Sequence, residues 1–302
     1  MTQNPVQIAF ITDTNALQPT LVAMWSALRH ATAPVRVIFV GIDLSAAGWS
    51  AVETTVGRFP DASVDPVRFH RDLLQDVRSP SAYISSATFA RLFLHRFVSG
   101  RVLYLDGDIL VTGDLTRIAR ADLDGRPAAA VCDYVVQKWA SRVAQGKDRG
   151  GKGARRLERI APITCPAPPA SYVNAGLILL DMDRITAEPA LVSQLEDVQA
   201  AATYPLADQD HLNRVFAGRI LHLGPEWNCS WRRLTRQRQY QAATGIPTDP
   251  ATAATGPVVI HYHGKYKPWQ PVPLKHALRA APLAFEYRLA RSRFRRDTRL
   301  PE

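Results

Sequence analysis

Two aspartates one residue apart, Asp106 and Asp108, directly follow the apolar run 101–105. Both carboxylates can reach one hard divalent cation, because oxygen ligands suit Mn²⁺ or Mg²⁺ and diphosphate oxygens commonly complete the coordination. Gly107 between them lets the backbone turn and approach a ligand closely. An Asp-Gly turn between two strands produces the same three residues, so the motif alone leaves metal binding and a simple turn open.

A second polar group, from His261 to Lys267, follows another apolar run at 258–260. A neutral imidazole is a sound ligand for Mn²⁺, and the ammonium group of Lys267 suits a phosphate. A lone histidine at the end of a strand is commonly structural. Its combination with Gly264 and Lys267 favours a site for a metal ion and a phosphate.

Two further segments carry polar side chains in unusual places. The acidic and amide groups of 208–210 suit the start of a helix, where they cap free amide groups, so a structural role accounts for them as well as a catalytic one does. Asn174, followed by two small residues inside the apolar run 172–181, indicates either the close approach of a ligand or a β-bulge.

Apolar runs alternate with helical patterns along the first half of the chain. Strands are expected at 6–11, 35–40, 64–69 and 101–105, and helices at 17–28, 46–59 and 85–96. Continuous apolar strands that alternate with helices predict a parallel sheet covered on both faces. Ligands of such sheets bind beyond the carboxyl ends of the strands, which is where the acidic turns 13–15 and 106–108 fall.

The second half of the chain is less regular. Strands are expected at 128–132, 172–181, 219–223 and 258–261, and helices at 190–201 and 208–216. Residues 138–170 are rich in glycine, proline and charge, and are predicted to form a mobile excursion.

The composition is that of a globular protein: 302 residues, 46% hydrophobic and 21% charged. The net charge of +10 is concentrated, because residues 138–159, 232–238 and 275–302 carry +15 between them and leave −5 for the rest. This distribution argues against a nucleic-acid groove and suits local anionic partners such as phosphates or a membrane surface. Three cysteines form no paired framework and favour the cytoplasm.

The C-terminal residues 272–302 are predicted to form a basic amphipathic tail after a catalytic domain of residues 1–271. The apolar positions Leu274, Leu278, Ala281 and Phe285 share one helical face, and six arginines follow them. Such a tail is typical of a membrane-surface anchor, with a solvated helix as the alternative. No window approaches the roughly 20 apolar residues of a membrane-spanning helix.

The order and spacing of these segments resemble glycosyltransferase family 8, the retaining galactosyl- and glucosyltransferases, lipopolysaccharide enzymes among them, that use nucleotide-sugar donors. The resemblance rests on six blocks: Phe10–Asn15, Ser86–Leu92, Leu105–Asp108, Asn174–Gly176, Asp208–Asp210 and His261–Trp269. It implies an α/β protein of the GT-A fold: one Rossmann-like nucleotide-sugar-binding domain with a mixed, mainly parallel sheet, plus a short basic helical C-terminal extension.

The resemblance also implies a role for each matching residue. The metal ligands, for Mn²⁺ or alternatively Mg²⁺, would be Asp106, Asp108 and His261. The nucleotide and its phosphates would contact Asp13, Asn15, Asp106, Gly107, Gly264 and Lys267. The donor sugar would face Arg91, Asn174, Ala175, Asp208 and Gln209. The candidate catalytic residues are Gln209, Asp133, Asp210 and Asp208.

The implied reaction transfers a hexose, with glucose or galactose favoured, from a UDP-sugar to a saccharide acceptor of an envelope or exported glycan. The metal and Lys267 would neutralise the departing diphosphate. Because Gln209 is a neutral amide and a poor nucleophile, front-face attack is favoured, and Asp133 and Asp210 stay alternative nucleophiles.

Two other classes of protein fit the sequence less well. A haloacid-dehalogenase-type phosphatase expects Gly-Thr after its Asp-x-Asp motif, whereas Ile109 and Leu110 follow Asp108. A basic nucleic-acid-binding protein would interleave its charges with exposed aromatic residues. We therefore expect no nucleic-acid partner, and a cytoplasmic enzyme that the tail attaches to the inner face of the plasma membrane.

Overall fold

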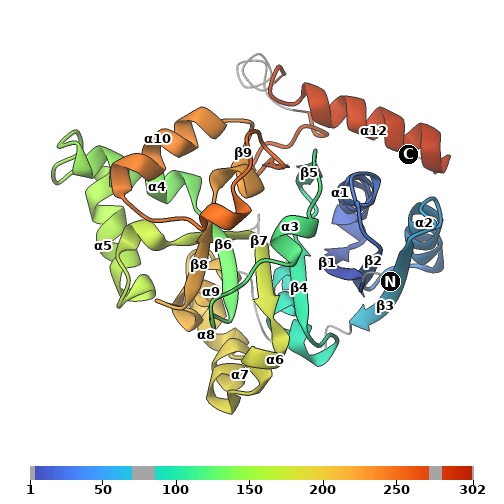
Figure 1. Cartoon of the computed structure of the whole chain (residues 1–302), viewed down its shortest axis with the longest axis horizontal. Coiled ribbons are helices and arrows are strands. Elements are labelled where there is room, and N and C mark those ends of the chain that lie inside the picture. Colours follow the sequence, from blue (N-terminus) through green and yellow to red (C-terminus); the bar gives the residue numbers. More distant parts are fainter. Residues whose placement is uncertain (1–3, 70–85, 272–280, 301–302) are drawn as a thin grey trace.

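The computed structural model describes residues 4–69, 86–271 and 281–300 (Figure 1). A seven-stranded sheet runs through the molecule in the order β3-β2-β1-β4-β7-β6-β8. Its strands are β1 (Val6–Asp13), β2 (Val35–Ile42), β3 (Ala62–Phe69), β4 (Arg101–Leu105), β6 (Ala128–Cys132), β7 (Val173–Asp181) and β8 (Ile220–Leu223). β7 is antiparallel to both β4 and β6, and the other pairs are parallel. The predicted mixed, mainly parallel sheet is confirmed.

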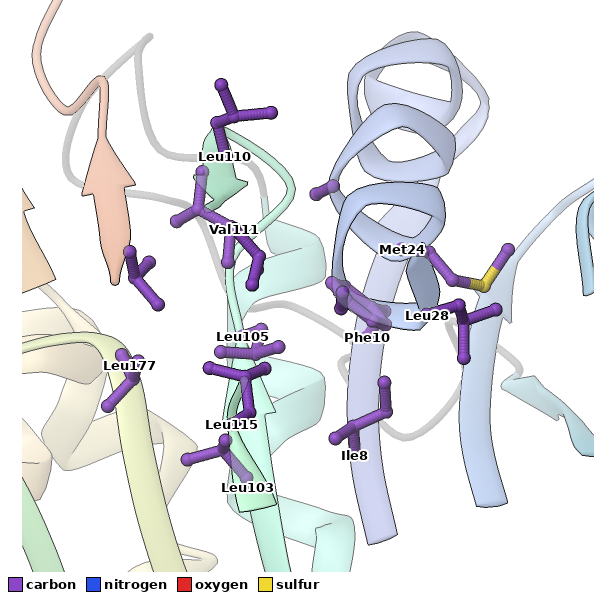
Figure 2. Packing of buried hydrophobic residues seen from close by; sticks show 14 of the residues in the cluster. Ile8, Phe10, Met24, Leu28, Leu103, Leu105, Leu110, Val111, Leu115 and Leu177 are labelled. Carbon is purple, nitrogen blue, oxygen red and sulfur yellow. The ribbon is translucent and has the colours of Figure 1, made fainter. Parts of the chain in front are cut away.

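Both faces of the central strands are buried, as the continuous apolar runs predict. Successive side chains of a strand point to opposite faces, so Ile8 and Phe10 of β1 lie in one core and Ala9 lies in the other. Figure 2 shows Ile8 and Phe10 together with Met24 and Leu28 of the helix α1 (Leu17–Arg29).

Helices cover the two faces of the sheet. One core contains side chains of α1, of α2 (Ala46–Val56) and of the short α3 (Thr116–Ala119). The other contains side chains of the 3₁₀ helix η3 (Ser86–Arg96) and of α6 (Met182–Thr186), α7 (Pro189–Leu195), α8 (Val198–Thr203) and α9 (Asp208–Val215). The single helix expected at 190–201 is therefore two helices, and Asp197 caps the second by accepting a hydrogen bond from the Ala200 amide.

A second, three-stranded sheet contains β5 (Ile109–Val111), β10 (Val259–His261) and β9 (Cys229–Ser230). β10 runs antiparallel to β5, with His261 opposite Ile109, and parallel to β9. The apolar pattern predicts β10 but neither of its partners, because strands of two and three residues are too short to show a period.

The prediction of a mobile excursion at 138–170 is wrong. Most of this segment belongs to the helices α4 (Tyr134–Ala144) and α5 (Lys152–Thr164), followed by the 3₁₀ turn η4 (Pro169–Ser171). The glycines at 146, 150 and 151 lie only in the connection between the two helices. Val136 and Ala140 of α4 are buried, so tertiary packing stabilises helices that the local composition disfavours.

The remaining elements lie at several places along the chain. They are η1 (Thr14–Ala16), η5 (Pro225–Asn228), α10 (Leu234–Thr244), η6 (Pro250–Thr252) and α12 (Phe285–Thr298). α10 packs against α4, and α12 lies beside α1 (Figure 1). In the described part of the chain, no helix combines the length and the apolar character that crossing a bilayer requires.

The helix α12 is joined to the main core. Tyr287 and Phe294 are each 1% exposed, and the ring of Phe294 meets that of Trp25 edge-on with 6.2 Å between centroids. Leu274 and Leu278, two of the four apolar tail positions, lie outside the described residues. The division into a domain of residues 1–271 and a tail of 272–302 stays a prediction. The structure shows that α12, which belongs to the predicted tail, shares the core of the larger part.

Candidate active site

A cavity of about 1660 Å³ opens where β1, β4 and β6 end. Twelve of the fifteen predicted site residues line it: Asp13, Asn15, Arg91, Asp106, Gly107, Asp108, Asp133, Asn174, Gln209, Asp210, Gly264 and Lys267. The other three, Ala175, Asp208 and His261, lie behind its wall and contact residues that line it. The structure thus brings together side chains that are up to 254 positions apart in the sequence.

The three predicted metal ligands converge at one point. Ligand atoms of Asp106, Asp108 and His261 all lie within 4.8 Å of one another. The Nε2 atom of His261 is 3.0 Å from Asp108 Oδ1 and 3.9 Å from Asp106 Oδ2. Two carboxylates and an imidazole at this spacing fit one divalent cation such as Mn²⁺.

Backbone pairing creates this cluster. Asp106 extends β4, since its amide donates to the Gly176 carbonyl of β7 at 2.9 Å. Asp108 immediately precedes β5, and the antiparallel pairing of β5 with β10 continues past His261 through the Tyr262 amide, which donates to the Asp108 carbonyl at 3.0 Å. The register of two short strands therefore decides that His261 lies beside the two aspartates.

The orientation of the His261 ring depends on Asn228, a residue that the sequence analysis missed. The Nδ1 atom of His261 lies 2.9 Å from Asn228 Oδ1, and Asn228 Nδ2 donates to Asn174 Oδ1 at 2.9 Å. Because the amide oxygen can only accept, Nδ1 carries the proton and Nε2 is left with a free lone pair for a metal. A single asparagine after the expected strand 219–223 gives no sequence signal for this role.

Gly176 leaves room for the same two ligands. A Cβ atom placed there would lie 2.3 Å from His261 Cε1 and 2.9 Å from Asp106 Oδ2. The small residue therefore permits the close approach of two predicted metal ligands to β7.

Lys267 contacts the same cluster from the loop after β10. Its ammonium group forms an ion pair with Asp108 and donates to the Tyr262 carbonyl at 3.1 Å. Burial alone would raise the pKa of the Asp108 carboxyl, but the neighbouring His261 and Lys267 hold that pKa well below its usual value. Asp108 is accordingly a carboxylate that is already paired with positive charge.

Arg91 connects the predicted metal ligand Asp106 to Asp208 and Ala175, two of the predicted donor-sugar residues. Its guanidinium group bonds Asp106 Oδ1 at 3.0 Å, Asp208 Oδ2 at 2.8 Å and the Ala175 carbonyl at 2.9 Å, and lies over the Tyr104 ring. Burial disfavours the charge, yet these two carboxylates raise the pKa of Arg91 above its usual value. Arg91 therefore holds Asp106 in place as well as facing the cavity.

Asp208 is turned towards Arg91. It is 4% exposed and lies at the start of α9. Burial raises the pKa of its carboxyl, and the nearby Asp106 adds to the rise while Arg91 opposes it. In this position the Asp208 carboxylate contacts Arg91 and does not line the cavity.

Amide groups form the neighbouring wall. Asn174 Nδ2 donates to Asp133 Oδ2 at 3.2 Å and to Gln209 Oε1 at 3.1 Å, and the Ala175 amide donates to the same Gln209 oxygen at 3.2 Å. These bonds hold Gln209 and Asp133 side by side across β7. Asp133 also caps α4, because its Oδ1 accepts from the amides of the second and third residues after it at 2.8 and 3.0 Å.

Asp210 is held from both sides. Tyr172 donates its hydroxyl to Oδ1 at 2.5 Å, and the Leu206 amide donates to Oδ2 at 2.8 Å. Burial raises the pKa of the Asp210 carboxyl, and the hydrogen bond from Tyr172 opposes the rise. Both carboxylate oxygens of Asp210 therefore already accept a hydrogen bond.

The end of the cavity beside α1 is formed by the turn after β1. Asp13 Oδ1 accepts from the amides of Asn15 and Ala16 at 3.0 and 3.1 Å, which fixes the turn. Gly107 packs so closely on α1 that a Cβ atom there would lie 2.1 Å from Thr20 Oγ1. The predicted nucleotide residues thus lie next to the metal cluster in space.

Comparison with known proteins decides the family of the chain. The sequence model described as "Glycosyl transferase family 8" matches residues 7–272. The chain belongs to glycosyl transferase family 8. It is therefore a glycosyltransferase, as the resemblance predicts.

Curated relatives of this family 8 protein come from plants and bacteria. A "Probable galacturonosyltransferase-like 10" of Arabidopsis thaliana is 24% identical over 87% of the chain and 71% of the relative. The "Lipopolysaccharide 1,2-glucosyltransferase" of Escherichia coli K12 is 27% identical over 67% of the chain and 54% of the relative. The "Lipopolysaccharide 1,3-galactosyltransferase" of Salmonella typhimurium is 25% identical over 61% and 49%.

Solved structures confirm the GT-A fold. The galactosyltransferase LgtC, crystallised with donor and acceptor sugar analogues, superposes with a TM-score of 0.67 at 22% identity, over 93% of this chain and 95% of LgtC. The bifunctional glycosyltransferase WbbM gives a TM-score of 0.66 at 21% identity, and the match spans 47% of its length.

One histidine of this family 8 chain has no predicted role. His263 lies 2.6 Å from Ser230 Oγ, and its ring is edge-on to His261 with 5.3 Å between centroids. Burial and the neighbouring His261 lower the pKa of His263 to about 4. A neutral His263 ring adds no positive charge beside His261.

Proposed function

We propose that this family 8 protein is a retaining hexosyltransferase that moves glucose or galactose from a UDP-sugar to a saccharide acceptor. The observation that carries the proposal is the cluster of Asp106, Asp108 and His261 at the wall of a cavity that extends from the Asp13 turn to Gln209. Mn²⁺ is the favoured cation and Mg²⁺ the alternative. A divalent cation held by these residues supplies positive charge for the departing diphosphate.

Other residues of the cavity are proposed to bind the nucleotide, the diphosphate and the donor sugar. Asp13 and Asn15 bind at the nucleotide end, and Gly107, Gly264 and Lys267 surround the diphosphate. The Lys267 ammonium adds to the charge that stabilises the leaving group. On the donor sugar side, Asn174, Ala175 and Gln209 offer hydrogen-bonding groups, while Asp208 orients Arg91.

Retention of configuration is proposed to follow from front-face attack. Gln209 is a neutral amide, and both oxygens of Asp210 already accept hydrogen bonds. Asp133 Oδ2 accepts from Asn174 alone among the hydrogen bonds of the described residues, so Asp133 is the stronger of the two alternative nucleophiles. Covalent trapping of a glycosyl-Asp133 adduct with a fluorinated donor would decide for double displacement.

The testing experiment measures UDP release. The purified chain is incubated with UDP-glucose, UDP-galactose and UDP-N-acetyl sugars, with and without Mn²⁺. Metal-dependent release from at least one donor is expected, and Asp106→Asn and Asp108→Asn should abolish it while circular dichroism shows a folded protein. No metal-dependent release from any donor contradicts the proposal.

The acceptor is proposed to belong to an envelope or exported glycan, in keeping with the two lipopolysaccharide enzymes among the relatives. Membership of family 8 decides against the phosphatase alternative. We further propose that the enzyme works in the cytoplasm.

The outer face of α12 is proposed to contact an anionic membrane. Phe285 is 64% exposed and Leu289 is 39% exposed one turn later, and Arg288, Arg293 and Arg296 are exposed on the same helix. Apolar side chains among arginines suit the surface of an anionic bilayer. Because Tyr287 and Phe294 belong to the core, deleting the tail would disturb the fold as well as the surface.

Point substitutions therefore test the membrane proposal. Phe285→Ser with Leu289→Ser should weaken binding to vesicles that contain phosphatidylglycerol. Leu206→Ser provides the control, since this residue is 47% exposed far from α12 in the sequence. Unchanged vesicle binding by the double variant contradicts the proposal.

A further inference from the structure

The cavity is larger than a usual small-molecule site. Ligand pockets for small molecules commonly enclose roughly 300–1,000 Å³, whereas this one has about 1660 Å³. Beyond the predicted donor residues it continues along α4 and α5 and past residues 204–206. This additional part is the space left for the acceptor.

One face of α5 forms a wall of that part. Arg156, Arg159, Ile160 and Ile163 line the cavity, and their spacing of three, four and seven residues places them on a single helical face. Lys152 and Arg155 on the same helix do not line it. The side of α5 that faces the cavity is therefore apolar and basic, and carries no acidic residue.

The arginines of this wall have no carboxylate partner among the residues that the structure describes. Arg214, one turn after Asp210 on α9, also lines the cavity. Within the described ranges, no acidic group lies within 4.0 Å of the guanidinium groups of Arg156, Arg159 or Arg214. By contrast, Arg91 and Lys267 at the donor end both pair with aspartates. The cavity thus has one end where charges are balanced and one where positive charge is unmatched.

Trp139 orients one of these arginines. The guanidinium carbon of Arg156 lies 4.6 Å from the centre of the Trp139 ring. Stacking covers the face of the planar group and leaves its edge of N–H donors available, which is the geometry for bidentate binding of a carboxylate or phosphate.

The position of Trp139 separates this site from the diphosphate. Asp133 caps the start of α4 beside Asn174 and Gln209, and Trp139 is six residues further along the helix. A rise of 1.5 Å per residue places it about 9 Å beyond Asp133. A saccharide whose hydroxyl reaches the donor sugar near Gln209 therefore extends along α4 towards Arg156 and Arg159.

We propose that the acceptor is an anionic saccharide, and that Arg156, Arg159 and Arg214 bind a carboxylate or phosphate on it beyond the reacting hydroxyl. This inference rests on the proposed glycosyl transfer, because only that reaction makes the bound saccharide an acceptor. The preference for an anionic over a neutral saccharide does not depend on the donor.

The test compares matched probes that differ only in charge. Trigalacturonate is paired with its full methyl ester, and maltotriose 6-phosphate with maltotriose. Calorimetric titration of the full chain, without donor, should show at least one anionic probe binding about tenfold or more tightly than its neutral partner. The two pairs distinguish a carboxylate from a phosphate.

Two double variants locate the site. Arg156→Gln with Arg159→Gln should remove most of the preference, whereas Lys152→Gln with Arg155→Gln removes the same charge from residues of α5 that do not line the cavity and should keep it. Equal binding of charged and neutral probes by the unmodified chain overturns the inference, and so does equal loss in both double variants. UDP release is measured on the same samples, so a failure of the proposed function is recognised separately.

Discussion

Replacing Gly176 by alanine should weaken metal binding without touching a ligand. The new Cβ atom would lie 2.3 Å from Cε1 and 2.8 Å from Nδ1 of His261, and 2.9 Å from Asp106 Oδ2. Ordinary contact begins at 3.4 Å, so the imidazole must move by about 1 Å. Metal–ligand distances hold within roughly 0.2 Å of their normal values, and the displaced ring cannot keep both its bond to Asn228 and its place beside Asp108.

The size of the effect follows from the packing. Overfilling a tightly packed site costs about 1–3 kcal/mol, and disturbing the groups that orient metal ligands lowers affinity by about 10–100-fold. We expect the Mn²⁺ concentration for half-maximal UDP release to rise by a factor in that range. Electron paramagnetic resonance of free Mn²⁺ measures the same affinity without turnover.

Gly256→Ala is the matched control, because no atom lies within 4 Å of its added Cβ and its φ lies outside the left-handed region. If Gly176→Ala binds Mn²⁺ with the affinity of the unmodified chain, the assignment of His261 and Asp106 as neighbouring ligands is refuted.

Three further predictions concern the elements around the site. Tyr287→Ala removes a ring whose centroid lies 5.4 Å from that of Tyr262 and 5.0 Å from that of Trp269. The free energy of unfolding in urea should fall by about 3–5 kcal/mol. An unchanged midpoint of the urea unfolding curve would show that α12 is not part of the core. Arg91→Lys leaves the buried carboxylate of Asp208 without its planar partner, so the free energy of unfolding in the same assay should fall by about 3 kcal/mol. An unchanged free energy of unfolding would contradict the role of Arg91 as the bridge between Asp106 and Asp208. Burial lowers the pKa values of His211 and His222 below 6.5. The stability that the two neutral rings contribute is therefore present above pH 6.5 and is lost as the pH falls through the lowered pKa values. The melting temperature should fall from pH 7 to pH 5, and His222→Gln should reduce that fall.

The apolar runs were sufficient to predict the central sheet. β1, β2 and β4 are local apolar runs whose burial on both faces follows from their composition, and the position of Asp106 directly after β4 follows with it. Local composition misled at 138–170, because the helical faces of α4 and α5 become favourable only when residues such as Val136 are buried against other elements.

The candidate site was predictable in its membership but not in its arrangement. The motif of Asp106, Gly107 and Asp108 and the run after β10 are visible in the sequence, and the order of the blocks indicates the family. That Asp208 faces Arg91 instead of the cavity, and that both oxygens of Asp210 are engaged, depends on how α9 packs on β7.

The sequence by itself therefore determined the strands, the polar turns at their ends, the basic segments and the family. Only the tertiary structure decided which of these residues meet. The pairing of β5 with β10 brings His261 to Asp108, Asn228 orients the imidazole, and one face of α5 collects two arginines in the cavity. The physical reason is that the order of apolar and polar side chains in a segment indicates its secondary structure and which of its faces is buried. Strand register and helix packing, by contrast, depend on contacts between segments that lie far apart in the chain.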